Sequence, residues 1–174
     1  MIFKNKFNIY KGMVLLYLMN SRKTNDLKFG EECEYIFLSV FKNYKKKSNN
    51  KMDEIDFKHK TKNKLAELKG RKYNFTDCKD WKVSMNKLIY HQTHNKNGDF
   101  FVYMLFYDGL YFWKYNEKEV HKKDCAWDER VDRGKTEKNF YFNIKRQLFT
   151  KSKYDIYAPK DMSNVKNIQE CLID

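Results

Sequence analysis

The feature that most constrains the fold is a pair of aromatic-rich segments separated by a short turn. Residues 101–107 and 110–115 are both rich in Phe, Tyr and Trp, and Asp108-Gly109 stands between them. An Asp-Gly pair between two apolar segments is a strong signal for a β-hairpin with a type I′ turn. Strands that are apolar on both faces are typical of the centre of a covered sheet. We therefore expect core packing, rather than stacking on a ligand, to be the role of these aromatic side chains.

The spacing of apolar residues predicts the other elements. Helices are expected at residues 1–20, 31–44, 81–91 and 162–172. Strands are expected at residues 54–59 and 64–73, with a turn at 61–63 between them, and at 140–148, where the strand continues into a short helix. Residues 45–51 and 118–138 are charged and predict irregular connections. This order predicts an α/β (α+β) protein with one mixed sheet flanked by helices.

Chain length predicts how these elements are organised. A chain of 174 residues is enough for one domain and short for two. We expect a single domain over 1–174, with an N-terminal helical segment at 1–28, a core at 29–115 and a mixed C-terminal extension at 116–174. Hydrophobic residues make up 41% of the chain and aromatic residues 17%, which excludes a disordered basic tail.

The charge balance indicates the kind of partner. Lys and Arg total 36 against 23 Asp and Glu, so the formal net charge is +13. A charge of this size favours a polyanion, of which nucleic acid is the commonest, over a soluble protein that carries lysine as its ordinary surface residue. A membrane surface is disfavoured because no long basic amphipathic helix is evident.

Targeting signals and cysteines indicate the compartment. No apolar segment reaches the roughly 18 residues of a membrane-spanning helix, and no small-residue cleavage site follows the apolar residues near the N-terminus. The four cysteines are widely spaced, without a Cys-x-x-Cys pair. We therefore expect neither signal peptide nor transmembrane segment, and an intracellular protein of a reducing compartment, cytoplasm or nucleus.

Two carboxylates and a lysine form the strongest candidate site. Glu67 and Lys69 stand two apart in a predicted strand, so they share one face while Leu68 points into the core. If the turn at 61–63 pairs this strand with the one before it, Asp56 lies on the face of Glu67 and Lys69. Carboxylate oxygens are the ligands that Mg²⁺ prefers. The three side chains therefore indicate metal-assisted phosphodiester hydrolysis, with Lys69 assisting the attacking water.

The pattern resembles the PD-(D/E)xK nuclease superfamily, the fold of many restriction endonucleases and Holliday-junction resolvases. A helix opens with Gly-Glu-Glu-Cys-Glu at 30–34, an isolated acid follows in Ile-Asp-Phe, and the next strand carries Ala-Glu-Leu-Lys-Gly-Arg at 66–71. An amphipathic helix and a further strand come next. This matches the α-β-β-β-α-β order of the superfamily core over about residues 29–115, although no clear first strand is evident between residues 44 and 53.

The resemblance implies a Mg²⁺-dependent DNA endonuclease, with Mn²⁺ as a substitute ion. Asp56, Glu67 and Lys69 correspond to the catalytic set, and the Leu68 carbonyl and Glu34 complete the metal ligands. Glu31 or Glu32 takes the place of Glu34 if the helix phase differs, and Asp53 is the alternative to Asp56. Candidate nucleic-acid contacts are Arg71, Lys87, Gln92, Arg130, Arg133 and Lys135.

Two other interpretations use the same residues differently. The chain would be a non-catalytic nucleic-acid-binding protein on the same fold, or a basic virion or packaging protein in which the carboxylates are incidental. The partner expected in every case is nucleic acid, and double-stranded DNA for the enzyme. Nucleases of this kind that cut both strands often work as dimers, so the resemblance also implies a homodimer.

Overall fold

The computed structural model describes residues 24–47, 55–77, 79–130 and 137–160. Its centre is a mixed six-stranded sheet, the main sheet, with the order β1-β2-β3-β5-β6-β9. The strands are β1 Tyr44–Lys46, β2 Phe57–His59, β3 Lys64–Gly70, β5 Asp99–Phe106, β6 Gly109–Lys114 and β9 Thr150–Lys151. Only β3 and β5 pair in parallel, and the other neighbours are antiparallel.

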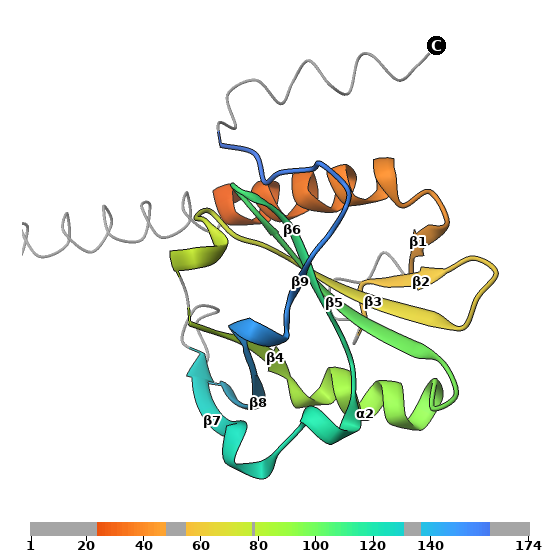
Figure 1. The fold of residues 1–174 in the computed structure, drawn as a ribbon, viewed down its shortest axis with the longest axis vertical. Coiled ribbons are helices and arrows are strands. Elements are labelled where there is room, and N and C mark those ends of the chain that lie inside the picture. The colour runs from red at the N-terminus through yellow and green to blue at the C-terminus, as the bar shows by residue number, and fades with distance from the viewer. Residues whose placement is uncertain (1–23, 48–54, 78, 131–136, 161–174) are drawn as a thin grey trace, which may run out of the picture.

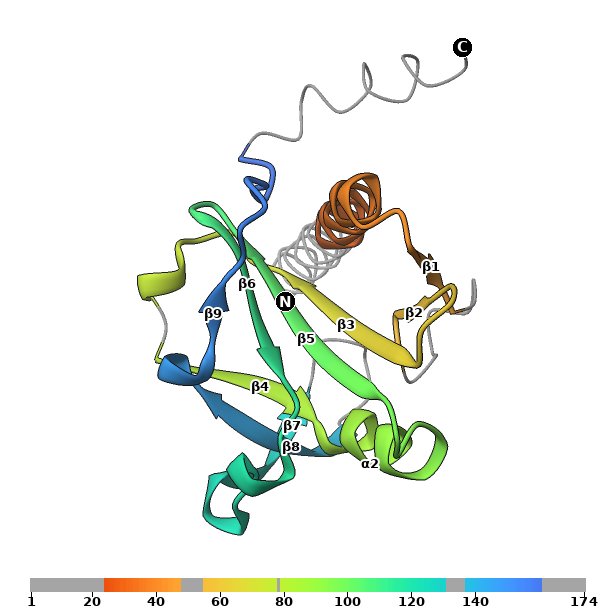
Figure 2. The same cartoon turned by 45° about the vertical axis from the view of Figure 1, so that its right-hand side comes forward.

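The remaining elements cover the two faces of the main sheet (Figures 1 and 2). A helix whose described part spans residues 24–40 lies over one face. The other face is covered by α2 Met85–His94 and a three-stranded antiparallel sheet with the order β4-β8-β7. These strands are β4 Asp80–Ser84, β7 Cys125–Arg130 and β8 Glu137–Lys145. The short 3₁₀ helices are η1 Phe75–Asp77, η2 Glu117–Glu119, η3 Lys122–Asp124 and η4 Arg146–Leu148.

One hydrophobic core, the helix-side core, lies between the main sheet and helix 24–40. Its buried residues are Phe29, Cys33, Phe37, Tyr44, Phe57, Ala66, Leu68, Tyr103, Leu105, Leu110 and Ala158. The helix contributes Phe29, Cys33 and Phe37, which stand four apart and so share one face. Gly70 on β3 allows the close approach, since a Cβ there would lie 2.9 Å from Phe29 and would collide with the Cys33 sulfur.

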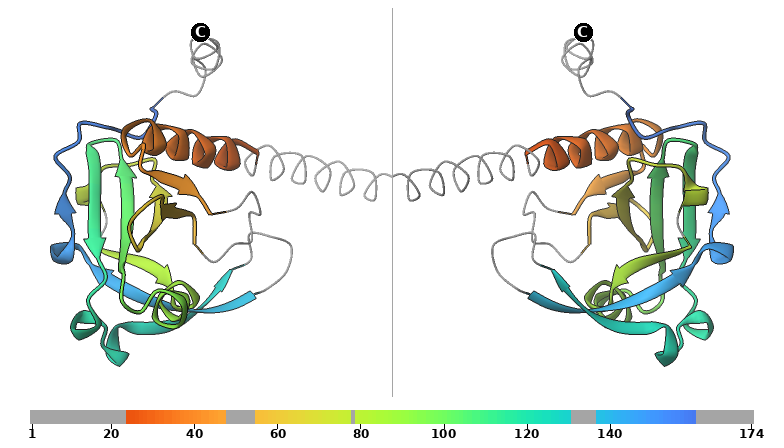
Figure 3. Two further views of the ribbon diagram at one scale, coloured as in Figure 1. Left: turned by 90° about the vertical axis from the view of Figure 1, so that its right-hand side faces the viewer. Right: turned by 90° about the vertical axis from the view of Figure 1, so that its left-hand side faces the viewer.

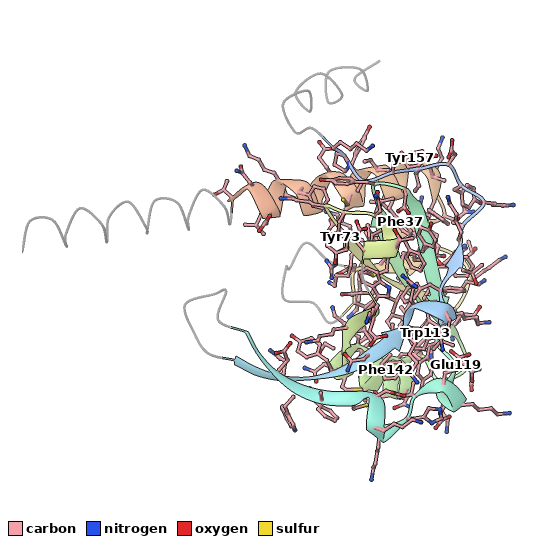
Figure 4. The ribbon with its side chains drawn as sticks, turned by 60° about the vertical axis from the view of Figure 1, so that its left-hand side comes forward. Phe37, Tyr73, Trp113, Glu119, Phe142 and Tyr157 are labelled. Carbon is pink, nitrogen blue, oxygen red and sulfur yellow. The ribbon has the colours of Figure 1, made fainter. Side chains whose placement is uncertain are left out.

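A second core, the α2-side core, fills the space between the main sheet, α2 and the small sheet. Its buried residues are Ile55, Leu65, Trp81, Val83, Leu88, Phe100, Val102, Met104, Phe106, Trp113, Phe142, Ile144 and Phe149. Figure 4 labels Phe37 of the helix-side core and Trp113 and Phe142 of the α2-side core. Alternate residues of β5 enter the two cores, so the aromatic hairpin packs on both of its faces as the sequence predicts.

The hairpin is confirmed, but its turn differs from the predicted one. Phe106 pairs with Gly109, so the two turn residues are Tyr107 and Asp108 rather than Asp108 and Gly109. A type I′ turn needs positive φ at both turn residues. Among the described residues positive φ occurs at Gly109 alone, with φ +136°, and so the turn is not type I′. Asp108 is held instead by accepting a hydrogen bond from the Phe75 N–H at 2.9 Å.

Three short strands differ from the prediction of helix or irregular chain. β1 lies where a charged loop was expected over 45–51, and it supplies the first strand of the superfamily order. Residues 81–84 belong to β4 rather than to the expected helix 81–91, because Trp81 and Val83 alternate into the core while Lys82 stays exposed. β7 lies within the segment 118–138 that predicted an irregular connection.

The predicted fold class is confirmed: the described residues form a mixed α/β structure with helices on both faces of a mixed sheet. The strand expected at 140–148 is β8 followed by η4. The helices expected at 1–20 and 162–172 lie outside the described residues. The division at 28 and 115 stays a prediction, and β9 from the expected extension pairs with β6 of the expected core.

Among the helices in the described part of the chain, none is both long enough and apolar enough to cross a bilayer.

Candidate active site

The site is built on β3, whose successive side chains point to opposite faces of the main sheet. Ala66 and Leu68 enter the helix-side core, and Leu65 enters the α2-side core. Because side chains alternate along a strand, Glu67 and Lys69 point to the side of Leu65 and α2. Glu67 is fully buried there, with no exposed surface. A carboxylate is thus fully buried on the side of the sheet that carries the α2-side core.

Two lysines compensate the buried charge of Glu67. Lys69 Nζ lies 2.5 Å from Glu67 Oε1, and Lys87 Nζ of α2 lies 3.0 Å from Glu67 Oε2. Beyond these ammonium groups, neither oxygen has a hydrogen-bond partner among the described residues. Burial alone would raise the pKa of Glu67, but the charges of Lys69 and Lys87 outweigh it and lower the pKa below its ordinary value. Glu67 is therefore an ionised carboxylate, and its oxygens receive no backbone donor from the described ranges of the chain.

Asp56 joins this cluster from the residue immediately before β2. Its Oδ2 accepts a hydrogen bond from the Leu68 N–H at 2.8 Å, so it takes the place of a strand neighbour where the pairing of β2 with β3 ends. The pKa of Asp56 is raised to about 6, mainly by burial and also by the charge of Glu67, against the opposing effects of Lys69 and the Leu68 N–H. The two carboxylates therefore act on each other electrostatically, as the pairing through the turn predicts.

Lys69 connects the buried carboxylates to solvent. Its side chain is 39% exposed although its ammonium group contacts Glu67. Burial of that group would lower the pKa of Lys69, but Glu67 and Asp56 raise it more, and the net direction is upward. Lys69 is thus held as a protonated ammonium group at the outer end of the cluster.

The sequence did not predict where Asp56 and Lys87 lie in detail. Asp56 was expected within a strand, whereas it precedes β2 in a bend. Lys87 was expected to contact phosphate, and the structure pairs it with Glu67. The signal for this pairing was the change of period at Ser84, from alternation in β4 to helical spacing in α2, which sets where the first turn of α2 begins.

The other expected metal ligand, Glu34, is separate from the cluster. It forms an ion pair with Lys46 of β1, at 2.6 Å between Oε2 and Nζ. Lys46 pairs with Phe57 in the sheet, which is the residue after Asp56. Glu34 is thus placed at the edge strand β1, and its role as a ligand through water stays a prediction.

The expected nucleic-acid contacts are spread over several elements. Arg71 follows β3 and donates from Nη1 to the Gly70 carbonyl at 2.9 Å. Gln92 donates to the Tyr115 hydroxyl at 2.8 Å, away from Lys87. Arg130 is the last residue of β7, where it pairs with Glu137. Arg133, Lys135 and the alternative acid Asp53 lie outside the described residues.

The donor set can be compared with what a divalent metal requires. In the described ranges, no group of three or more His, Cys, Asp or Glu side chains is placed to hold an ion. Asp56 and Glu67 supply carboxylate oxygens, which suit Mg²⁺ or Mn²⁺ and do not suit a thiolate-bound or histidine-bound metal. In an extended strand the N–H and C=O of one residue point to the same side. The Leu68 carbonyl therefore faces the side on which Asp56 accepts the Leu68 N–H, and it fits as a third oxygen.

Comparison with known proteins adds an independent observation. A protein-family model described as "Phage putative PDDEXK endonuclease" matches residues 23–151. Among curated proteins and among solved structures, no match was found. The matched range contains Asp56, Glu67, Lys69 and Lys87, together with the strands and the helix that hold them. The resemblance predicted from the sequence is confirmed, and the chain belongs to this phage PDDEXK endonuclease family of the PD-(D/E)xK superfamily.

Proposed function

We propose that the protein is a divalent-metal-dependent DNA endonuclease that hydrolyses phosphodiester bonds with water as the nucleophile. The observation that carries this proposal is the buried Glu67, whose two oxygens are met only by ammonium groups in the part of the chain that the structure describes. A structural carboxylate at such depth normally accepts backbone or hydroxyl hydrogen bonds. Contact with ammonium groups alone therefore supports a catalytic role for Glu67 rather than a structural one.

The metal ligands in this proposal are Asp56, Glu67 and the Leu68 carbonyl, with waters completing the coordination. A bound Mg²⁺ or Mn²⁺ ion would lower the pKa of a bound water and offset charge on the phosphate. The two carboxylates repel each other, which contributes to the raised pKa of Asp56. A cation between them would remove that repulsion, so the donor set is more favourable with the ion than without it.

Lys69 acts in this proposal through its charge. Its raised pKa keeps the ammonium protonated at neutral pH, so it donates hydrogen bonds and does not accept a proton. Its side chain is partly exposed, so this donor lies where the buried carboxylates meet solvent. Lys69 would orient the attacking water and offset the negative charge that grows on the phosphate during hydrolysis.

Lys87 acts behind the carboxylates. Its side chain is only 16% exposed, so it reaches Glu67 from within the protein layer. It therefore orients Glu67 and keeps it ionised, which a metal ligand requires. The net charge of +13 supports DNA as the polyanion that the surface binds. Arg71, Gln92, Arg130, Arg133 and Lys135 remain the proposed contacts to its backbone.

A plasmid assay tests the proposal. Purified full-length protein is incubated with supercoiled plasmid and either Mg²⁺ or Mn²⁺, and nicked and linear products are measured. We expect cleavage that depends on the metal and is lost in Glu67→Ala and Lys69→Ala. Matched controls are Asp26→Asn and Lys82→Ala, which change an exposed carboxylate and an exposed lysine that form surface ion pairs. Both control variants should cleave like the unaltered protein.

The same assay distinguishes the alternative. Binding of DNA without cleavage in either metal would contradict the enzyme and would favour a non-catalytic nucleic-acid-binding or packaging protein. A homodimer is part of the proposal for double-strand cleavage, and the ratio of linear to nicked product as protein concentration rises measures it.

A further inference from the structure

An exposed aromatic pair on the β7–β8 ribbon has no role in the site described above. Trp127 of β7 and Phe140 of β8 are directly opposite each other in the antiparallel register. Their ring centroids are 5.1 Å apart, with the planes inclined by 37°. Trp127 is 69% exposed and Phe140 is 36% exposed. A large apolar surface at this exposure costs free energy in water, so it requires an explanation.

The pair lies on the inner face of the ribbon. Phe140, Phe142 and Ile144 alternate along β8 and so share one face, and the last two are buried in the α2-side core. The inner face therefore continues past the core and becomes uncovered at Trp127 and Phe140. Figures 3 and 4 show the ribbon projecting beyond the body of the protein at this end.

The pair also lies at the end of the small sheet that leads into α2. β4 ends where Ser84 pairs with Tyr141, so Phe140 lies one residue beyond the last residue of β4. Ser84 leads directly into α2, whose first turn carries Lys87, and Lys87 contacts Glu67. The exposed rings thus lie at the end of the small sheet where β4 passes into α2, the helix that carries Lys87.

The chemistry of the surface favours a nucleobase as its occupant. Aromatic side chains stack on any base, and such stacking is tolerant of sequence. The net charge of +13 favours a polyanion over an apolar protein partner. Bases of an intact duplex are already stacked on each other, so an exposed ring can meet only an unpaired base or an opened base step.

We propose that Trp127 and Phe140 form a stacking platform for an unpaired base of the DNA substrate, next to the bond that is cut. This inference rests on the proposed function for the identity of the substrate. It adds that DNA with unpaired nucleotides is preferred over a perfect duplex. Stacking on one base would strengthen binding by about fivefold or more.

Tryptophan fluorescence tests this platform directly. The chain has three tryptophans, of which Trp81 is 3% exposed, Trp113 is 1% exposed and Trp127 is 69% exposed. Acrylamide should therefore quench one accessible component of the emission, which disappears in Trp127→Phe. Full-length protein in EDTA, where metal-dependent cleavage cannot occur, is titrated with a forked DNA and with a perfect duplex of equal length. We expect the forked DNA to protect Trp127 from acrylamide.

Affinity measurements provide the second readout. Trp127→Ala should weaken binding of the forked DNA by about fivefold or more and change duplex binding little. Trp127→Phe should keep most of the preference because a phenyl ring still stacks. Tyr157→Ala is the matched control, since Tyr157 is 46% exposed and lies far from the ribbon in Figure 4. Thermal unfolding of each variant confirms that it is folded.

Several results would overturn the inference. Trp127 that is shielded from acrylamide in the free protein would show another part of the chain, or a second copy, covering the pair. Equal protection by the perfect duplex would exclude a preference for unpaired bases. DNA binding that leaves Trp127 fully accessible would contradict this inference alone, whereas no binding to either DNA would contradict the proposed function as well.

Discussion

The two faces of β3 differ although both are buried. Ala66 and Leu68 pack against helix 24–40 among apolar side chains. Glu67, between them in sequence and fully buried, meets two ammonium groups on the side of α2. On the apolar face, helix 24–40 packs close to β3, and Gly70 allows that close approach. The second face holds charges that packing does not require.

This difference indicates that one face of β3 contributes to stability and the other face to catalysis. Replacing a buried ion pair with apolar residues of similar size is often neutral or stabilising. The cluster of Asp56, Glu67, Lys69 and Lys87 is therefore poorly explained by stability alone. Changes on the helix side of β3 should therefore alter unfolding, while changes on the α2 side should alter cleavage.

The largest expected effect is on cleavage in Glu67→Ala. Loss of a metal ligand should reduce plasmid cleavage by at least about a hundredfold, because the charge that holds the ion is gone. Leu68→Ala should instead lower the free energy of unfolding by about 2–4 kcal/mol and still cleave below its unfolding temperature. Cleavage rates and chemical denaturation of both variants check the contrast, and loss of cleavage in both folded variants would contradict it.

The next effect is the pH dependence of stability through Asp56. Its pKa is about 6 in the folded protein against an ordinary value of 3.8, so the folded state retains a proton that the unfolded state releases. The free energy of unfolding should therefore fall by up to about 3 kcal/mol as pH rises from about 4 to about 6.

Asp56→Asn isolates that contribution. The variant should lack the decline between pH 4 and 6, whereas Asp26→Asn should retain it, because Asp26 forms an exposed ion pair with Lys72. Glu67 acts in the opposite sense, since its lowered pKa gives stability that is lost as pH falls below its ordinary value of 4.5. Denaturation curves across this pH range provide the measurement, and identical profiles for the two variants would exclude a raised pKa at Asp56.

A smaller effect is expected from Lys87→Met. It removes one of the two cations on Glu67, so the pKa of Glu67 should rise. The free energy of unfolding at neutral pH should fall by about 1.5–3 kcal/mol. Lys82→Met is the matched surface change, because Lys82 and Asp128 pair at 2.6 Å with both side chains exposed. Lys82→Met should lower the free energy of unfolding by about 1 kcal/mol or less. Equal costs would mean that Lys87 does not neutralise a buried charge.

Two glycines give the smallest effects, with opposite signs. Gly70→Ala should destabilise by about 1–3 kcal/mol, because its Cβ meets Phe29 and Cys33 of helix 24–40. Gly30→Ala, within that helix and with no atom within 4 Å of its Cβ, should stabilise by up to about 1 kcal/mol. Thermal unfolding of the two variants tests whether β3 needs the close helix contact on its apolar face.

The sequence predicted the parts of the fold whose signals are local. The aromatic segments predicted the hairpin, and the turn after His59 predicted the pairing of β2 with β3. His59 accepts hydrogen bonds from the N–H groups of Thr61 and Lys62, which stabilises this turn locally. Alternation along β3 then placed Glu67 and Lys69 on one face. These signals involve neighbouring residues only.

The features that were missed depend on distant contacts. β1 has three residues and two exposed lysines, so its pairing with β2 leaves no pattern in the sequence. β7 is charged and forms a strand because β8 pairs with it. Lys87 meets Glu67 only because α2 crosses the face of β3, and the exposure of Trp127 depends on where β4 ends. Of these features, only the start of α2 leaves a signal in the spacing along the chain, through the change of period at Ser84.

The most direct test of the central claim is a calorimetric titration of the full-length protein with Mn²⁺ in the absence of DNA. We expect saturable binding that is lost in Glu67→Gln and in Asp56→Asn, and is retained in Asp26→Asn. Binding that persists unchanged in both site variants, or no saturable binding by the unaltered protein, would contradict the claim that Asp56 and Glu67 together hold a divalent metal.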